Sequence, residues 1–411
     1  MSFEAQQKYN NGMKQVKALV HIFKVPFFVF ILECLILFIP FLGIKQNRIA
    51  DGTPYHLFPL THWSAFLILL IVILTLLITV FSLPRRRYLE ALIGAVLLIF
   101  PWIHIAYSGA FLLEGLPQAA RISPQAGTWM CIAASYILYA DALKYIRNKL
   151  FMWLIILIPL VLIMSIALSG GLDSFSILKE YYNKSDRFMY EFTTHLFLSG
   201  MSVLFACCIG IPLGLIAYKK NILQNGIFFF TNTVQTIPSL ALFGLLIAPL
   251  SFISYQFPIL REFGIKGIGA APALIALSLY ALLPVTLNTF TSFNQIDDSV
   301  KESGRGMGMG PYQLFFLVEV PLSLPLLLNG VRIAAVLTIG NTAVAALIRA
   351  GGLGSFIFQG LGQSAPDLIL LGVIPIIILA ITVDRIFALV IYLVSPSSMR
   401  IQLEQADKKT A

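Results

Sequence analysis

The sequence has little charge. Charged residues make up 11% of the chain and hydrophobic residues 58%, whereas soluble domains carry about 25% charged residues. This composition excludes an ordinary soluble globular protein and indicates a chain that crosses a membrane many times. The net charge of +9 fits an excess of basic residues facing anionic lipid, so we expect membrane lipid and no nucleic acid among its partners.

The sequence also lacks the common motifs of nucleotide and metal chemistry. It has no Gly-x-x-x-x-Gly-Lys-Ser/Thr loop and no His-Glu-x-x-His pair, which hold phosphates and zinc in many enzymes. Its five histidines are scattered, and its four cysteines all lie inside apolar runs, so no disulfide framework is implied. We therefore expect no catalytic site, no metal site and no cofactor in this chain.

Long apolar runs dominate what is present. A membrane-spanning helix needs about 20 apolar residues, and the chain predicts an all-α, polytopic membrane protein with about ten such helices. The expected spans are 25–43, 63–83, 89–108, 127–146, 150–169, 192–218, 225–250, 268–290, 323–348 and 367–393.

The distribution of lysine and arginine predicts the orientation. With the N-terminus inside the cell, most of the 28 basic residues fall on the inner side, as the positive-inside rule requires. Residues 1–24 are basic, and the apolar run after them has no convincing cleavage site, so it should remain as an anchor. Both termini and the loop at 291–322 are then expected to face the cytoplasm.

This loop differs from its apolar surroundings and predicts a helix, a turn and a second helix. Asp297, Asp298 or Ser299 can cap the first helix, and Ser299 with Glu302 has capping-box spacing. Closely spaced glycines end it at 306–310. Pro311 can begin the second helix, and Pro321 should stop it. The expected product is a short, rigid bracket.

The spacing of this loop resembles the signature loop of the membrane-spanning subunits of binding-protein-dependent ABC importers. In that family the loop docks on a cytoplasmic ATPase, so the resemblance implies an ATPase-coupling role. Two of the signature alanines are replaced by serine and glycine here. The matching residues are Glu302, Ser303, Gly304, Gly308, Val318, Val320 and Pro321.

The polar stretch near 170–190 divides the chain. We expect an N-terminal module of about five transmembrane helices at 1–188, a permease domain at 189–395 and a cytoplasmic tail at 396–411. The second half resembles the five-helix core of ABC importer permeases. Within that family, Gln235–Gly244, Ala350–Gly354 and Gly210–Gly214 look like the glycine betaine, choline and carnitine branch, some of whose members carry extra N-terminal spans.

The resemblance implies partners and a location. It implies two ABC ATPase subunits that bind ATP and magnesium, an extracytoplasmic substrate-binding protein, and a second permease copy or a sister permease. The chain itself would be a non-catalytic, multi-pass subunit in the bacterial plasma (inner) membrane. It would import glycine betaine or a related quaternary-ammonium osmolyte.

Three polar stripes at helical spacing predict a translocation path. Pro238 should kink the seventh span, and Gly340 should allow close helix approach. An alternative stays open, because small polar residues in membrane helices also bond to neighbouring helices or to their own backbone. The stripes are His195, Ser199 and Ser202; Asn232, Gln235, Thr236 and Ser239; and Thr338, Asn341 and Thr342.

Further residues are candidates for a gate or for charge pairing. In the family, the region of Gly351, Gly352 and Gly354 lies at the external gate, although a plain glycine turn would look the same. Glu33, in the first span, should pair with a polar group on a neighbouring helix or be neutral. Asp384 and Arg385, in the last span, should pair with other charges or reach the membrane surface.

Other functions remain possible at this stage. The chain could be a secondary transporter or channel whose loop matches the signature by chance, or an importer permease for another small solute such as an amino acid. The stripes are neutral, which favours a zwitterion or a quaternary amine over a tightly bound ion. The sequence leaves open the solute, the pairing of permeases and the role of the first five spans.

Overall fold

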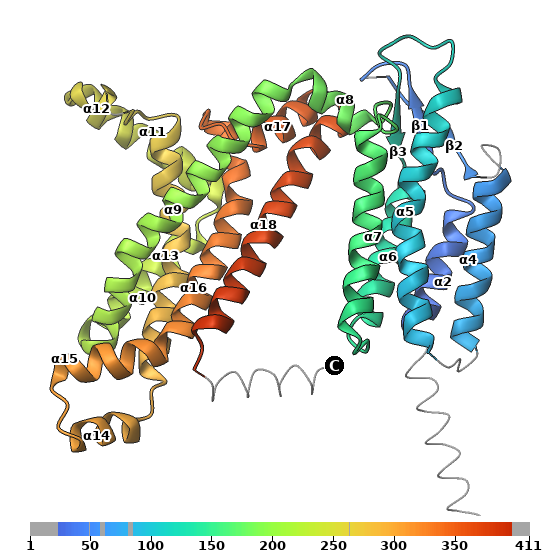
Figure 1. The fold of residues 1–411 in the computed structure, drawn as a ribbon. Coiled ribbons are helices and arrows are strands. Elements are labelled where there is room, and N and C mark those ends of the chain that lie inside the picture. Colours follow the sequence, from blue (N-terminus) through green and yellow to red (C-terminus); the bar gives the residue numbers. More distant parts are fainter. Residues whose placement is uncertain (1–23, 49, 58–61, 81–84, 263, 397–411) are drawn as a thin grey trace, which may run out of the picture. The chain divides into compact units, whose positions relative to one another are not determined.

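The computed structural model describes residues 24–396, apart from 49, 58–61, 81–84 and 263. The described part is dominated by helices (Figure 1). It divides into two compact units, one up to Tyr182 and one from Asn183 onward. Among these residues, eight helices are long and apolar enough to cross a membrane. Residues 397–411 of the expected tail lie outside the described part.

The first unit is built on long apolar helices. The first of them, α2, is shorter than the expected span at 25–43, because the chain leaves the helix before Pro40 and enters a strand. Its 13 residues extend about 20 Å at 1.5 Å per residue. The helices of this unit are α2 (Lys24–Ile36), α4 (His62–Val80), α5 (Arg86–Leu112), α6 (Ala126–Ala142), α7 (Lys149–Leu168) and α8 (Ser176–Asn183).

A small antiparallel sheet joins the loops of this unit. Strand β1 (Leu42–Lys45) lies between β2 (Thr53–Tyr55) and β3 (Arg121–Pro124). The hydroxyl of Ser123 donates to the carbonyl of Gly43 at 3.2 Å and reinforces the pairing. The expected all-α fold did not include this sheet, because its strands have only three or four residues and one partner lies far along the chain.

Glu33 is fully buried in the first unit. The hydroxyl of Thr75, on α4, donates to one of its carboxyl oxygens at 3.0 Å. The expected pairing with a polar group on a neighbouring N-terminal helix is confirmed. A hydroxyl partner lowers the cost of placing a carboxyl group among apolar helices.

The second unit contains the loop that resembles the family signature. In Figure 1 its long helices run side by side, with α14 and α15 at one end of the bundle. Its elements are α9 (Ser185–Lys219), α10 (Asn221–Thr236), α11 (Ser239–Gln256), α12 (Ile259–Glu262), α13 (Ala270–Asn294), α14 (Asp298–Gly306), α15 (Pro311–Leu314), a π-helical turn (Phe315–Glu319), α16 (Val320–Thr342), a 3-10 turn (Ala343–Ile348), α17 (Gly354–Gly362) and α18 (Pro366–Val394).

The expected single span at 225–250 is wrong. The chain forms two helices there, α10 and α11, separated at Ile237 and Pro238. Proline lacks an N–H and forces the residue before it into an extended conformation, and Ile237 has φ −72° and ψ 126°. The side-chain amide of Gln235 donates to the carbonyl of Tyr280 at 3.0 Å, while the Tyr280 hydroxyl donates to the carbonyl of Ile237. These two bonds hold the break against α13.

Helix α13 forms the centre of the second unit and packs against both α9 and α16. Small residues make this close packing possible: Ala276, Ala281 and Ala334 are fully buried at these contacts. A side chain at Gly214 would place its Cβ 2.7 Å from the carbonyl oxygen of Thr286. Helices α9, α13 and α16 therefore form the closely packed core of the second unit.

An ion pair ties α16 to α18. The guanidinium of Arg332 donates to both carboxyl oxygens of Asp384, at 2.7 and 2.9 Å. This bidentate geometry is the favoured arrangement for arginine and carboxylate. Charge pairing at Asp384 is confirmed, and Arg332 is its partner.

Breaking this pair should impair folding. We expect Arg332→Leu or Asp384→Leu alone to lower the yield of monodisperse protein severalfold, because each leaves one charge unpaired among apolar helices. The double variant R332L/D384L should recover most of the yield, since it leaves no charge behind. Size-exclusion chromatography of the detergent-solubilised chain measures this. A double variant that is no better than the worse single variant would show that the pair itself does not matter.

Candidate functional site

The bracket comprises α14, the turn at 307–310, α15 and the π-helical turn. It begins at Asp297, whose carboxylate accepts a hydrogen bond from the backbone N–H of Ser299 at 2.9 Å. Asp297 is therefore the N-cap, one of the three residues expected for this role. The expected capping box from Ser299 to Glu302 is wrong, because Ser299 lies inside the helix.

The turn after α14 requires glycine at one position. Gly308 has φ +83°, which residues with a side chain rarely adopt. Backbone N–H groups of Met307, Gly308 and Met309 donate to carbonyls of the last helical turn at 2.9–3.2 Å. The expected end of α14 in the glycine-rich stretch is confirmed, since the helix ends at Gly306.

The bracket has two arms, α14 and α15, which pack together at Gly304 and Leu314. Gly304 is buried, and a Cβ there would lie 2.6 Å from a methyl group of Leu314 and 3.5 Å from the sulfur of Met309. The replacement of the signature alanine by glycine therefore lets α15 approach α14 closely. The sequence did not identify Leu314, because an apolar residue in a short helix has no distinguishing pattern.

The second arm begins as expected but does not end as expected. Pro311 is at the start of α15, which confirms that prediction. Pro321 does not stop the helix: α15, the π-helical turn and α16 form one continuous apolar helical run, Pro311–Ile348. The N–H of Val320 bonds to the carbonyl of Phe315, five residues back, and this wider turn accommodates a proline that cannot donate.

The bracket contacts the end of α9. The Lys301 ammonium lies 5.7 Å from the Tyr218 ring and 2.9 Å from the carboxylate of Asp298. Partial burial opposes the charge on Lys301, but hydrogen bonds from its ammonium to Asp298 and Tyr218 outweigh this and raise its pKa. Tyr218 and Lys219 were not identified from the sequence; they stand at the end of a predicted span, where tyrosine and lysine are common.

Aromatic stacking connects the bracket to the central helix. The ring of Phe315 stacks on that of Phe293, in the last turn of α13, at 5.6 Å between centroids. The ammonium of Lys219 lies 4.8 Å from the Phe315 ring centroid. These contacts join the bracket to both α9 and α13.

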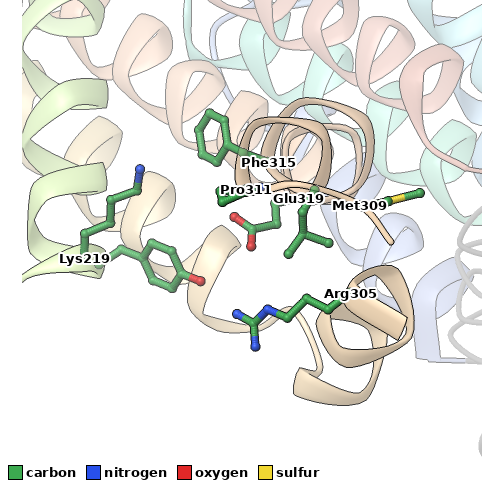
Figure 2. A pocket seen from close by; sticks show the side chains of 8 residues that line it. Lys219, Arg305, Met309, Pro311, Phe315 and Glu319 are labelled. Carbon is green, nitrogen blue, oxygen red and sulfur yellow. The ribbon is translucent and has the colours of Figure 1, made fainter. Parts of the chain in front are cut away.

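A cavity of about 610 Å³ lies between the bracket and the end of α9. Figure 2 shows Lys219, Arg305 and Glu319 around it, with Pro311 and Phe315. The bracket also exposes two large side chains that do not line the cavity: Met307 is 72% exposed and Tyr312 is 82% exposed.

The structure brings the signature residues together in two groups. Glu302, Ser303 and Gly304 lie on α14, with Gly308 in the turn after it, while Val318, Val320 and Pro321 lie where the π-helical turn joins α16. Glu302 is exposed, and the hydroxyl of Ser303 donates to the carbonyl of Ser299 at 2.7 Å. Within the first group Glu302, Ser303 and Gly308 are exposed, whereas Gly304 is buried against Leu314. The second group lies where the bracket continues into α16.

Lowering the pH should loosen the start of α14. Hydrogen bonds from the backbone and side chain of Ser299 lower the pKa of Asp297. A lowered pKa in the folded state means that the cap stabilises α14 above the unfolded value, about 3.9, and is lost as the pH falls through the lower folded value. We expect the hydrogen-exchange protection of the Ser299 amide to hold down to about pH 4 and to fall as the pH is lowered further through the folded pKa of Asp297. Asp297→Asn keeps a capping oxygen that does not titrate, so equal pH dependence in this variant would contradict the assignment.

The predicted translocation residues separate into two environments. The buried residues are His195, Ser199 and Ser202 on α9 and Thr338 and Thr342 on α16. The hydroxyls of Ser199, Thr338 and Thr342 donate to carbonyls of their own helices. This is the alternative given above for small polar residues in membrane helices, which bond to their own backbone. Asn341 is half-buried.

The stripe of the seventh span is only partly as expected. Asn232, Gln235 and Thr236 lie on α10, but Ser239 begins α11, because the helix breaks before it. Asn232 and Thr236 are exposed and Gln235 is half-buried. The close approach expected at Gly340 is wrong within this chain, since a Cβ there would have no atom within 4 Å.

Two of the predicted gate glycines, Gly351 and Gly352, lie against the opposite end of α9, whereas Gly354 packs against Ala343. The N–H of Gly352 donates to the carboxylate of Glu191 at 2.7 Å. The Nε2 of His195 donates to the carbonyl of Ile339 at 3.1 Å. A Cβ at Gly352 would lie 3.2 Å from the Nδ1 of His195, so the structure brings His195 and this glycine together. It also adds Glu191, which the sequence analysis missed because its partner lies 161 residues away.

A bundle of membrane-spanning helices that carries a capped bracket with a glycine turn defines the class of polytopic membrane proteins. Two family models match the chain: "ABC transporter permease YehY, N-terminal domain" over residues 23–178 and "Binding-protein-dependent transport system inner membrane component" over residues 210–398.

Curated relatives resemble the second half. The carnitine transport permease protein OpuCB of Listeria monocytogenes is 39% identical over 206 residues, which cover 50% of this chain and 87% of the relative. The osmoprotectant import permease protein OsmW of Salmonella typhimurium is 36% identical, covering 50% and 91%. The glycine betaine/carnitine/choline transport system permease protein OpuCB of Bacillus subtilis is 33% identical, covering 52% and 90%. The chain belongs to the family of binding-protein-dependent transport system inner membrane components.

Proposed function

We propose that this chain is the membrane-spanning subunit of an ATP-driven importer that moves glycine betaine or a related quaternary-ammonium osmolyte into the cytoplasm. The observation that carries the proposal is the bracket. It is capped at Asp297, hinged at Gly308 and stacked through Phe315 onto Phe293, while its outer surface stays open. Such a part transmits force between a docked protein and the helices behind it.

The proposal includes three kinds of partner. Two ABC ATPase subunits would bind ATP and magnesium and dock on the exposed side chains of Glu302, Met307 and Tyr312. Two permease cores, either two copies of this chain or one with a sister permease, would enclose the path. An extracytoplasmic binding protein would deliver the solute, so selection would not need a tight site within the spans.

The proposed location is the bacterial inner membrane, with both termini and the bracket on the cytoplasmic side. The excess of basic residues on that side of the predicted topology supports this orientation. The names of the relatives in Listeria, Bacillus and Salmonella support the substrate class. The neutral character of Asn232, Gln235 and Thr236 is compatible with a zwitterion or a quaternary amine.

Reconstitution tests the proposal. The chain, its ATPase and its binding protein are placed in proteoliposomes, and uptake of labelled glycine betaine, carnitine and choline is measured with and without enclosed ATP. We expect ATP-dependent uptake of at least one of them, and loss of uptake with Glu302→Lys, because the variant reverses a charge on the exposed docking surface.

Two results would contradict the proposal. Uptake of sugars or metal ions with no quaternary amine would overturn the substrate class. Solute uptake by the chain without any ATPase would favour a secondary transporter or a channel.

A further inference from the structure

The turn between α16 and α17 has a backbone conformation that aims an N–H group at α9. Arg349, Gly351 and Gly352 have φ values of +59°, +82° and +90°. These values reverse the chain within a few residues. The segment ends where α17 begins, at Gly354.

A buried carboxylate receives this N–H group. The side chain of Glu191 is only 9% exposed and accepts the Gly352 N–H at 2.7 Å. Its other oxygen lies 3.6 Å from the guanidinium of Arg187, one helical turn earlier. Arg187 also donates to the side-chain oxygen of Gln359, on α17, at 2.8 Å. Glu191 is therefore held in place from both sides.

The turn also fits closely against the next residues of α9. A Cβ at Gly351 would lie 3.1 Å from a methyl group of Thr194, and one at Gly352 would lie 3.2 Å from the Nδ1 of His195. His195 is fully buried and fixed by its bond to Ile339. The turn thus covers α9 from Glu191 to His195, and its polar attachment there is the carboxylate of Glu191.

We propose that Glu191 is a positioning residue of the outer gate, whose carboxylate latches the 349–354 turn onto α9 through the Gly352 N–H. The entrance can open to the binding protein only after this bond breaks. The inference rests on the proposed function for the meaning of the gate, whereas the latch itself is a property of this chain alone.

Accessibility of a cysteine beneath the turn tests the latch. Thr194→Cys is introduced into the full chain in lipid nanodiscs and labelled with a membrane-impermeant maleimide, with the chain that lacks this substitution as the background for the native cysteines. Glu191→Met has nearly the shape of Glu191→Gln but cannot accept a hydrogen bond from the turn. The two variants therefore differ mainly in the acceptor oxygen.

We expect Glu191→Met to raise the labelling rate of T194C at least fivefold and Glu191→Gln to leave it within twofold. Glu262→Ala, which removes an exposed carboxylate on α12, is the matched control and should have no effect. If the Glu191→Met chain does not fold, Glu191→Ala replaces it, and the labelling rate of T194C is measured in the same way. Equal rates in all variants, or an equal rise with glutamine and methionine, would overturn the latch.

The labelling needs no ATPase, binding protein or osmolyte, so its result is separate from the test of function. If Glu191→Met leaves labelling unchanged while the complex imports osmolytes, the latch is wrong and the importer stands. If labelling rises as expected but no quaternary amine is imported, the latch stands and the proposed substrate is wrong.

Discussion

Gly308→Val is expected to reduce the ATPase that co-purifies with this permease at least tenfold. Gly308 has φ +83°, and a β-branched residue is a strong outlier in this region, where an ordinary side chain already costs about 1–2 kcal/mol. The strain should open the turn and displace Met307 and Tyr312 from the docking surface. Affinity purification of the permease with its ATPase, quantified by subunit ratio, measures this.

Gly306→Val is the matched control for this experiment. It introduces the same side chain two residues earlier, inside α14, where a Cβ would have no atom within 4 Å. We expect this variant to retain most of the ATPase. Equal loss with both variants would show that the effect is due to added bulk and not to the backbone conformation at Gly308.

Gly354→Ala is expected to destabilise the chain by about 3 kcal/mol, the upper part of the range for overpacking. A Cβ at this position would lie 1.8 Å from the carbonyl oxygen of Ala343, so the backbone of the 3-10 turn or of α17 must move. The 349–354 turn would then lose its packing against α9. The apparent unfolding temperature of the detergent-solubilised chain measures the effect.

Gly340→Ala provides the comparison. It makes the same substitution in the interior of α16, with empty space around the new methyl group, and alanine is the better helix former by about 1 kcal/mol. We expect this variant to be as stable as the wild type or more so. An unfolding temperature for Gly354→Ala that matches that of Gly340→Ala would contradict the close packing at Gly354.

The parts of the bracket that depend on local chemistry could be predicted from the sequence. The cap at Asp297, the glycine-rich end of α14 and the start of α15 at Pro311 each follow from a residue and its nearest neighbours. The expected stop at Pro321 is wrong, because a proline inside a membrane helix can be accommodated by its surroundings, as Pro284 is within α13. The π-helical turn of Phe315–Glu319 accommodates Pro321, and the local sequence contains no pattern that predicts this turn.

The parts that depend on distant segments could not be predicted. The bond from Gly352 to Glu191 joins residues 161 positions apart, and the strand pair of Gly43 and Ser123 joins two loops. Only the packed fold brings such groups together. The burial of Ser199 and Thr338 could not be predicted either. A polar stripe has the same spacing in the sequence whether it lines a translocation path or bonds to its own helix.

Several features remain predictions. The domain limits at 188 and 395 were set by polarity, and the structure divides the described chain after Tyr182. The translocation path and the external gate were assigned from spacing and resemblance. The variants of Glu191 and Glu302 test the two ends of the permease unit independently.

Labelling of Met307→Cys tests the central claim most directly, because this side chain is 72% exposed at the tip of the bracket. An impermeant maleimide is applied to intact cells and to inside-out vesicles, with and without the bound ATPase. The account predicts labelling only in inside-out vesicles, and protection when the ATPase is bound. Labelling in intact cells, or equal labelling with and without the ATPase, would contradict it.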